Sequence, residues 1–339
     1  MSAQVAVRSV GEVTDSSRLA RLHAVKLSAL VREHGVIDDL QPHEFPGGAA
    51  LTVAGPAGDA AWVLLADSSG RGLGGAVAWA LRRRVTHLHV VADAGTGTLA
   101  RRATGFESVT VWRVDGRALR PAVADPLPSA PSVPAAHMDF ESVIRGAGAE
   151  PVIEHGVLSG EVMGLEVCRV VDDPFTGAVR LEVGVGAHDR EAFLMLHGDR
   201  PSAPALADVV RSVAEHRRRD VQGHPLARLA KERLLRHRLI ADPGSIGVAE
   251  MTPVPPPVPR TNLKDAVPCA AVAMIGGERV AVVCTAGVDL DAVPWAVDAR
   301  TALGLDRCLL ALPTRDALEV QRLLAAAVRP PIEIVTVAP

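Results

Sequence analysis

Short apolar runs alternate with amphipathic segments at both ends of the chain, in the same order. The N-terminal pattern predicts a helix, two strands around a Gly-Pro turn, and then helix, strand, helix and strand. These predicted elements are residues 15–34, 49–54, 61–66, 73–83, 87–92, 98–104 and 109–114. The C-terminal pattern repeats strand, strand, helix, strand, helix and strand at residues 270–274, 280–284, 290–303, 308–312, 315–328 and 332–337. The repeat predicts an internal duplication, with chance recurrence of a common α/β order as the alternative.

The middle of the chain has a different pattern. It predicts a short helix, a two-stranded hairpin, a third strand and two long helices, at residues 140–144, 165–171, 179–186, 192–196, 204–218 and 225–239. Two proline-rich stretches, 121–136 and 251–265, read as extended linkers on either side. The predicted domains are an N-terminal α/β module (1–120), a central segment (137–250) and a C-terminal α/β module (266–339). The expected fold class is α/β: two similar modules, each a mixed sheet with helices on both faces, flank a central α+β segment.

Composition narrows the class of protein. A chain of 339 residues is long enough for two or three domains, and its formal net charge of -3 does not fit a globally basic nucleic-acid coat or an acidic tail. No uninterrupted apolar stretch is long enough to span a bilayer, and the first residues lack a secretory pattern. The four cysteines form no C-x-x-C pair, so we expect reduced, buried thiols. A cytoplasmic protein without a membrane partner is expected.

An acid closes the second predicted strand of the N-terminal module. The run from Val63 to Ser69 contains Asp67, whereas the matching run from Val282 to Ala286 contains no acid. The order of elements around these runs resembles the core of restriction-endonuclease-like nucleases, known by the PD-(D/E)XK signature. In that family carboxylates bind a divalent metal and a lysine supports the attacking water, which suits phosphodiester cleavage. The Glu and Lys of the signature are missing here, so the resemblance implies nuclease-like modules that have lost their catalytic motif.

The central hairpin carries the best acidic candidates. By strand alternation Glu182 and Glu166 face the same side, roughly opposite each other. Nearby titratable groups extend the candidate catalytic set to Glu161, Glu166, Glu182, His188 and Asp189. Glu166 and Glu182 would be the ligands of a hard divalent cation, Mg or Mn. The alternative is a face on which Glu182 pairs with Arg180 or Arg169.

A glycine-rich turn follows the strand at residues 87–92 and opens the next helix. Gly95 and Gly97 would admit a pyrophosphate to the helix N-terminus, and Asp115 would accept a ribose hydroxyl. The alternative is an ordinary strand-to-helix turn. In the same strand, His87 and His89 share a face, and a packed or hydrogen-bonded pair is favoured over a metal site.

Residues 211–238 hold nine basic residues against three acids. This stripe could bind the phosphates of a nucleic acid, and its candidate contacts are Arg228, Lys231, Arg233, Arg236 and Arg238. On a helix over 225–239, Arg228, Lys231 and Arg238 would share one side. The alternative is a solvated helical face.

Three functions stay open at this point. The first is a nucleic-acid-associated protein whose nuclease-like modules are catalytically degenerate. The second is a metal-dependent nuclease or hydrolase centred on the acidic hairpin at residues 161–191. The third is a structural or interaction protein without catalysis. A homo-oligomer fits each of the three.

Overall fold

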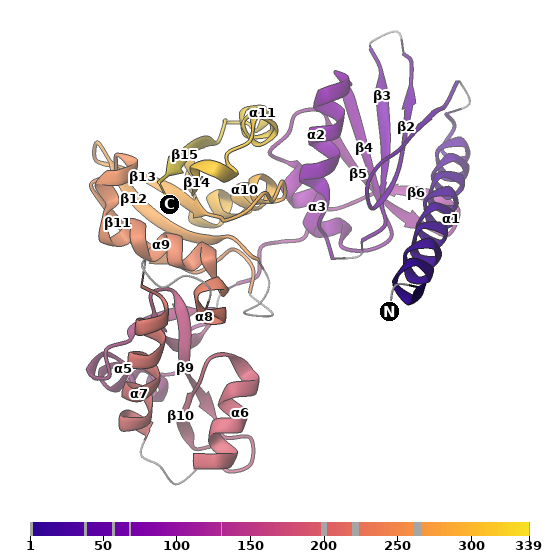
Figure 1. Ribbon diagram of the computed structural model, residues 1–339. Helices are drawn as coiled ribbons and strands as arrows, with labels where there is room; N and C mark the ends of the chain where they lie inside the picture. Colours follow the sequence, from indigo (N-terminus) through magenta and orange to yellow (C-terminus); the bar gives the residue numbers. More distant parts are fainter. Residues whose placement is uncertain are drawn as a thin grey trace. The chain divides into compact units, whose positions relative to one another are not determined.

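The computed structural model describes residues 3–36, 39–55, 58–67, 69–129, 131–197, 202–218, 224–259 and 266–338 (Figure 1). The chain forms two compact units, each assembled from separated segments. Unit 1 comprises Met1–Pro126, Leu290–Asp298 and Leu318–Ile332, and unit 2 comprises Leu127–Asp289, Ala299–Ala317 and Glu333–Pro339. Segments from the C-terminal end therefore complete the N-terminal unit.

Unit 1 is built on sheet A, whose six strands lie in sequence order. They are β1 (Gln41–His43), β2 (Gly48–Val53), β3 (Ala60–Leu65), β4 (His87–Ala92), β5 (Val109–Asp115) and β6 (Ala118–Pro121). Strands β3, β4 and β5 are parallel, and the remaining neighbours are antiparallel. The parallel strands are joined by crossover helices, as a parallel pair requires. Their apolar runs fit burial on both faces of the sheet.

Helices cover both faces of sheet A (Figure 1). Helix α1 (Ala3–Glu33) packs Leu27, Leu30 and Val31 against side chains such as Leu51 and Leu64 of the sheet. Helices α2 (Leu73–Arg83) and α3 (Thr96–Ala103) cover the opposite face as the crossovers between the parallel strands. The predicted helices and strands of the N-terminal module are all present, and strands β1 and β6 add to them.

Sheet C repeats this arrangement. Its strands are β11 (Glu250–Val254), β12 (Cys269–Ile275), β13 (Glu278–Cys284), β14 (Cys308–Pro313) and β15 (Glu333–Val337), in that order. The first three are antiparallel, and β13, β14 and β15 are parallel. Helices α10 (Ala292–Leu303) and α11 (Glu319–Ala327) are the crossovers, and α9 (Lys231–Ala241) packs on β11, β12 and β13. The five strands of sheet C therefore have the same order and the same relative directions as strands β1 to β5 of sheet A. The expected fold class of two similar modules is confirmed.

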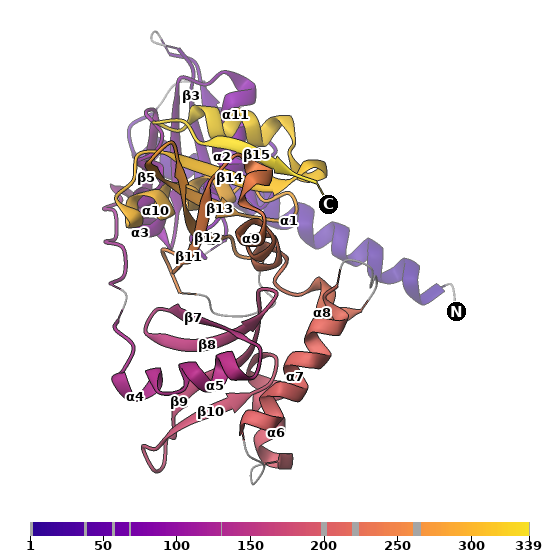
Figure 2. The same ribbon diagram turned by 90° about the vertical axis from the view of Figure 1, so that its left-hand side faces the viewer.

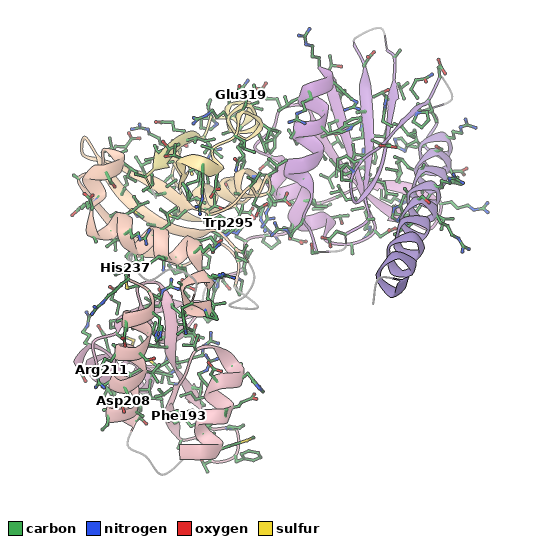
Figure 3. The ribbon with its side chains drawn as sticks, viewed as in Figure 1. Phe193, Asp208, Arg211, His237, Trp295 and Glu319 are labelled. Carbon is green, nitrogen blue, oxygen red and sulfur yellow. The ribbon has the colours of Figure 1, made fainter. Side chains whose placement is uncertain are left out.

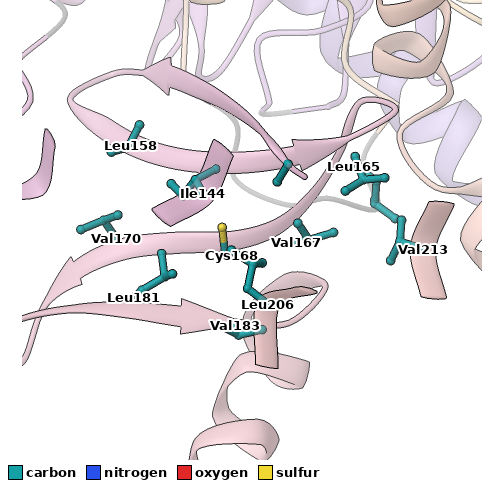
Figure 4. Close-up of a cluster of buried hydrophobic side chains, with 12 residues drawn as sticks. Ile144, Leu158, Leu165, Val167, Cys168, Val170, Leu181, Val183, Leu206 and Val213 are labelled. Atoms are coloured by element: carbon teal, nitrogen blue, oxygen red, sulfur yellow. The ribbon is translucent and has the colours of Figure 1, made fainter. Parts of the chain in front are cut away.

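Sheet B is the antiparallel sheet of the central segment. Its order is β10 (Val179–Val183), β9 (Leu165–Asp172), β8 (Val157–Val162) and β7 (Glu150–Glu154). Helices α5 (Glu141–Gly146), α6 (Gly186–His197) and α7 (Ser202–His216) pack on it, preceded by the short α4 (Ala135–Met138) (Figure 2). The buried core includes Leu158, Leu165, Val167 and Leu206 (Figure 4). The apolar side chains of β8 and β9 face these helices, which leaves polar side chains for the other face of the sheet.

Three predicted elements of the middle region were wrong. Residues 192–196, predicted as a strand, lie in helix α6, because a short apolar run reads alike in a strand and a buried helix. The helix predicted over 225–239 is two helices, α8 (Pro225–Arg228) and α9, interrupted where Ala230 has a φ of 45°. The linker predicted to begin at 251 instead starts in strand β11, with Pro253 tolerated because β11 is an edge strand.

Within unit 1, helices from the two ends of the chain pack closely. A Cβ on Gly74 of α2 would lie 2.1 Å from the Leu290 carbonyl oxygen, and one on Gly105 would lie 2.6 Å from Val297. The Asp291 carboxylate accepts hydrogen bonds from the backbone N–H groups of Gly72 and Gly74, at 2.7 and 2.9 Å. Asp298 is fully buried and pairs with two arginines of α3, Arg101 and Arg102. Glycine is needed at position 74 because any side chain would collide with backbone.

Candidate functional site

The carboxylates of the central hairpin are bound by arginines. Glu166 is buried and accepts from Arg169, through Nε at 3.1 Å and Nη2 at 3.0 Å, and from Nη1 of Arg190 at 2.9 Å. Glu182 accepts from Nη2 of Arg180 at 2.9 Å, and its other oxygen lies 3.4 Å from Nε of Arg190. Arg190 therefore bridges the two acids that the sequence proposed as metal ligands. The alternative pairing of Glu182 with Arg180 is present.

Glu161 belongs to a second buried ion cluster. It pairs with Arg233 and Arg236 of helix α9, which also pair with Glu154 of β7. All three of Glu161, Arg233 and Arg236 are almost fully buried. Because the glutamates come from sheet B and the arginines from α9, this cluster joins the central sheet to the helix that covers sheet C.

The hairpin residues do not fit a divalent cation. Positive guanidinium groups already take the oxygen positions of Glu161, Glu166 and Glu182 that a metal would need, and they repel a second positive charge. His188 and Asp189, the remaining members of the candidate set, are exposed on α6. No group of three or more His, Cys, Asp or Glu side chains in the described ranges could hold a metal ion. The chemistry of this cluster is ion pairing.

The Asp125 carboxylate lies against the glycine-rich turn and fills the space beside Gly97. The predicted pyrophosphate site lies at the N-terminus of α3, beside Gly95 and Gly97. A Cβ on Gly97 would lie 2.1 Å from the carboxylate carbon of Asp125, whose backbone N–H also donates to the Gly97 carbonyl at 3.1 Å. Asp115 is exposed at the end of β5 and lies 3.4 Å from Nε of Arg120. The negative charge of Asp125 stands where a phosphate would have to lie, which favours the ordinary-turn interpretation.

Several basic side chains of segment 211–238 bond to carbonyl groups or carboxylates of the protein itself. Arg217 is buried and donates to the carbonyl oxygens of Met163, Leu226 and Leu229. Arg211 lies 3.2 Å from Asp208 on α7, where Figure 3 labels both side chains. Of the five proposed nucleic-acid contacts, Arg233 and Arg236 are buried in the ion cluster, Arg238 is half-buried, and Arg228 and Lys231 are exposed. The helix break also places Arg228 and Lys231 on different helices, so the expected stripe on one helix does not form.

The position that resembles the nuclease motif holds one acid. Asp67 is exposed just beyond β3, and its carboxylate accepts from the backbone N–H of Ser69 at 2.8 Å. That hydrogen bond lowers the pKa of Asp67. Ser68 of the same run lies outside the described residues. At the matching end of β13 the chain has Cys284 and Thr285, so the two copies do not bring a pair of carboxylates to this position.

His87 and His89 lie in an aromatic cluster under α1. The His89 ring stacks on Trp62 with ring centroids 4.0 Å apart, and its Nδ1 accepts from Nε1 of Trp112 at 3.0 Å. His87 lies 4.5 Å from His89, centroid to centroid, and bonds to Thr110. Burial, followed by the charges of His87 and His34, lowers the pKa of His89 to about 4. The packed, hydrogen-bonded pair expected from the sequence is present.

A surface that the sequence analysis did not single out lies at the end of α2. We call it the arginine–aromatic surface and define it by His43, Phe45, Trp79, Arg82, Arg83 and Arg84. The Arg83 guanidinium lies 4.1 Å from the centroid of the Trp79 ring, while His43 and Phe45 approach that ring edge-on at 5.7 and 6.4 Å. The three arginines are exposed, and within the described part of the chain no carboxylate pairs with them. The signal in the sequence was an Arg-Arg-Arg run that begins three residues after a tryptophan, at Arg82.

None of the helices in the described residues is long and apolar enough to cross a membrane. No protein-family model, no curated protein and no solved structure matches this chain.

Proposed function

We propose that this protein is a non-catalytic nucleic-acid-associated protein that contacts its ligand through the arginine–aromatic surface. The observation that carries the proposal is a row of three exposed arginines without carboxylate partners in the described residues, beside a tryptophan that orders one of them. Arginine binds phosphate well because its planar guanidinium can donate two parallel hydrogen bonds to the phosphate oxygens. Three such groups in succession make a local positive patch on a chain whose net charge is -3.

The geometry of the patch suits single strands. Trp79, Arg82 and Arg83 share one side of α2 through their three-and-four spacing. The Trp79 ring holds the Arg83 guanidinium by a cation–π contact, which presents a flat, charged group to solvent. Unpaired bases stack on aromatic rings and on guanidinium planes, while phosphates pair with neighbouring arginines. On this proposal Arg82 and Arg84 contact the phosphates and Arg83 stacks on a base.

Two findings favour binding over cleavage. Metal-assisted hydrolysis of a phosphodiester needs carboxylates that share a cation. The described residues offer no such group, and the acids of the central hairpin are held by arginines. The duplicated nuclease-like modules would then serve as a scaffold for binding.

The proposal is tested by fluorescence anisotropy with a labelled single-stranded RNA and a DNA of the same sequence, at several salt concentrations. Each phosphate contact contributes a log–log salt slope of about -0.7 on single strands. The double variant Arg82→Ala/Arg84→Ala should bind more weakly and lower the magnitude of the slope by about 1.4. Both effects should be alike across sequences, because phosphate contacts do not read bases.

The matched control is Arg113→Ala/Arg117→Ala. It removes the same charge from exposed arginines of the same sheet, on strand β5 and in the turn that follows it. This control should bind as the unaltered protein does. Absence of binding by the unaltered protein at low salt would refute the proposal, and so would equal losses in the two double variants.

A further inference from the structure

Two of the four cysteines face each other across a pair of strands. Cys269 opens β12 and Cys284 closes β13, and the antiparallel register places them directly opposite. Residues paired in this way have Cα atoms about 4.5–5.5 Å apart, which lies within the range that a disulfide spans. Both thiols are free and almost fully buried, at the last rung of the β12–β13 ladder. They can therefore be joined without a change of register.

The surroundings of the pair shift the pKa values of the two cysteines in opposite directions. Burial opposes ionisation of Cys269, but the hydrogen bond with Cys284 and the charges of Arg236 and Arg233 outweigh it, so the pKa of Cys269 lies below its ordinary value. The hydrogen bond with Cys269 and burial raise the pKa of Cys284. Arg236 is fixed close by, since its Nη1 donates to the carbonyl oxygen of Ala270 at 3.1 Å. A thiol of lowered pKa directly opposite a second thiol can form a disulfide with it.

The other two cysteines lack this arrangement. Cys168 of sheet B and Cys308 of β14 are buried, and burial raises the pKa of each to about 12. Neither faces a second cysteine across its strand pairs. They behave as small apolar side chains and serve as internal controls.

We propose that Cys269 and Cys284 are a redox-active pair that a peroxide oxidises to a reversible intramolecular disulfide. In the first step the Cys269 thiolate attacks a peroxide oxygen. The O–O bond breaks, an S–O bond forms, and hydroxide leaves when the oxidant is hydrogen peroxide. The Cys284 thiol then attacks the sulfenic sulfur of Cys269: the S–S bond forms, the S–O bond breaks, and the departing hydroxide takes the thiol proton and leaves as water. Two thiols lose two electrons, and one peroxide is reduced.

Oxidation at this site is linked to the rest of unit 2 through Arg236. The same guanidinium pairs with Glu154 and Glu161 of sheet B, at 3.8 and 3.5 Å. Disulfide formation removes the ionisable thiol of Cys269 from beside Arg236, which stays paired with the two glutamates. Oxidation therefore changes the surroundings of Arg236 at the junction between α9 and sheet B.

The experiment is treatment of the full chain with hydrogen peroxide, followed by intact mass and tryptic mapping under non-reducing conditions. Trypsin separates the two residues, since Cys269 falls in the peptide 265–279 and Cys284 in the peptide 280–300. We expect the loss of two hydrogen atoms from the intact chain and a linked pair of these two peptides. Dithiothreitol should reverse both changes.

Serine variants show which two cysteines form the disulfide. Cys269→Ser and Cys284→Ser should each abolish the mass loss, whereas Cys168→Ser and Cys308→Ser should retain it, with folding followed by circular dichroism. Tryptic mapping of the unaltered protein decides the question even if a variant fails to fold. An unchanged mass after peroxide, oxidation to sulfinic acid without a cross-link, or a disulfide involving Cys168 or Cys308 would overturn the proposal.

Discussion

Arginine side chains have two opposite roles in this protein. Arg190, Arg217, Arg233 and Arg236 are buried and held by carboxylates or backbone carbonyl groups. The side chains of Arg82 to Arg84 are exposed. A buried guanidinium is tolerated only where its charge and donors are satisfied, because transfer from water to the interior is costly. The partners of Arg233 are Glu154 and Glu161, which lie 79 and 72 residues earlier in the chain, so no local pattern separates the two roles.

Protonation of His89 gives a prediction at the residue scale. Its Nδ1 accepts a hydrogen bond from Trp112, so the fold favours the neutral ring, and the pKa is lowered to about 4 by burial and by His87 and His34. The unfolded chain, with a histidine pKa near 6.5, binds more protons between these values. The free energy of unfolding should therefore fall as the pH decreases from about 6.5 to about 4.

Urea unfolding of the protein and of the His89→Asn variant, followed by circular dichroism at pH 7 and pH 4.5, measures this effect. Carboxylates that titrate in the same range contribute equally to both proteins, so the difference between them isolates His89. The variant should lose less stability than the unaltered protein on acidification. Identical losses would show that His89 does not carry a lowered pKa.

Elements from the two ends of the chain meet through small residues on α2. Gly74 and Gly75 are neighbours in the first turn of this helix, yet a Cβ on Gly74 would collide with the Leu290 carbonyl, while nothing lies within 4 Å of a Cβ on Gly75. Helical glycine is less favourable than alanine by about 0.5–1 kcal/mol, so the sequence alone predicts that both alanine variants stabilise the helix. The structure predicts opposite effects for the two variants, because a Cβ collides with backbone at Gly74 and meets nothing at Gly75.

Gly74→Ala should destabilise the protein by about 1–3 kcal/mol, the usual effect of overpacking against a rigid neighbour. Gly75→Ala should stabilise it by up to about 1 kcal/mol, because it reduces the conformational freedom of the unfolded chain. Urea midpoints of the two variants and the unaltered protein check both signs. If Gly74→Ala proved as stable as Gly75→Ala, the close packing of α2 on the segment at Leu290 would be wrong.

On the scale of the whole molecule, the proposed function predicts different contributions to nucleic-acid binding from the basic segment and from the arginine–aromatic surface. Residues 211–238 look strongly basic in the sequence, but Arg217, Arg233 and Arg236 are engaged inside unit 2. If the proposed function holds, Arg228→Ala/Lys231→Ala should leave the salt slope of nucleic-acid binding nearly unchanged, in contrast to Arg82→Ala/Arg84→Ala. Anisotropy titrations of the two double variants make the comparison. A larger loss from the Arg228 and Lys231 variant would move the binding surface to unit 2.

The sequence by itself determined most elements of the two duplicated modules and their order, although it did not predict the edge strands β1, β6 and β11. Strands such as β3 and β13 are nearly continuous apolar runs, and α2 and α10 follow them with helical spacing. These are local signals, because periodicity of 2 or 3.6 residues is written in neighbouring side chains. The pairing of His87 with His89 was accessible for the same reason, since both lie on one strand.

Only the tertiary structure decided which charged residues are available for binding. The acids of the hairpin looked like metal ligands until Arg190, Arg233 and Arg236 were brought against them from α6 and α9. Asp125 closes the Gly95–Gly97 turn from beyond β6, and Cys269 meets Cys284 only through strand register. A charge acts according to its nearest partner and its exposure, and both are set by residues distant in the chain. Local sequence therefore indicated most of the elements, while long-range packing decided which charged side chains remain exposed.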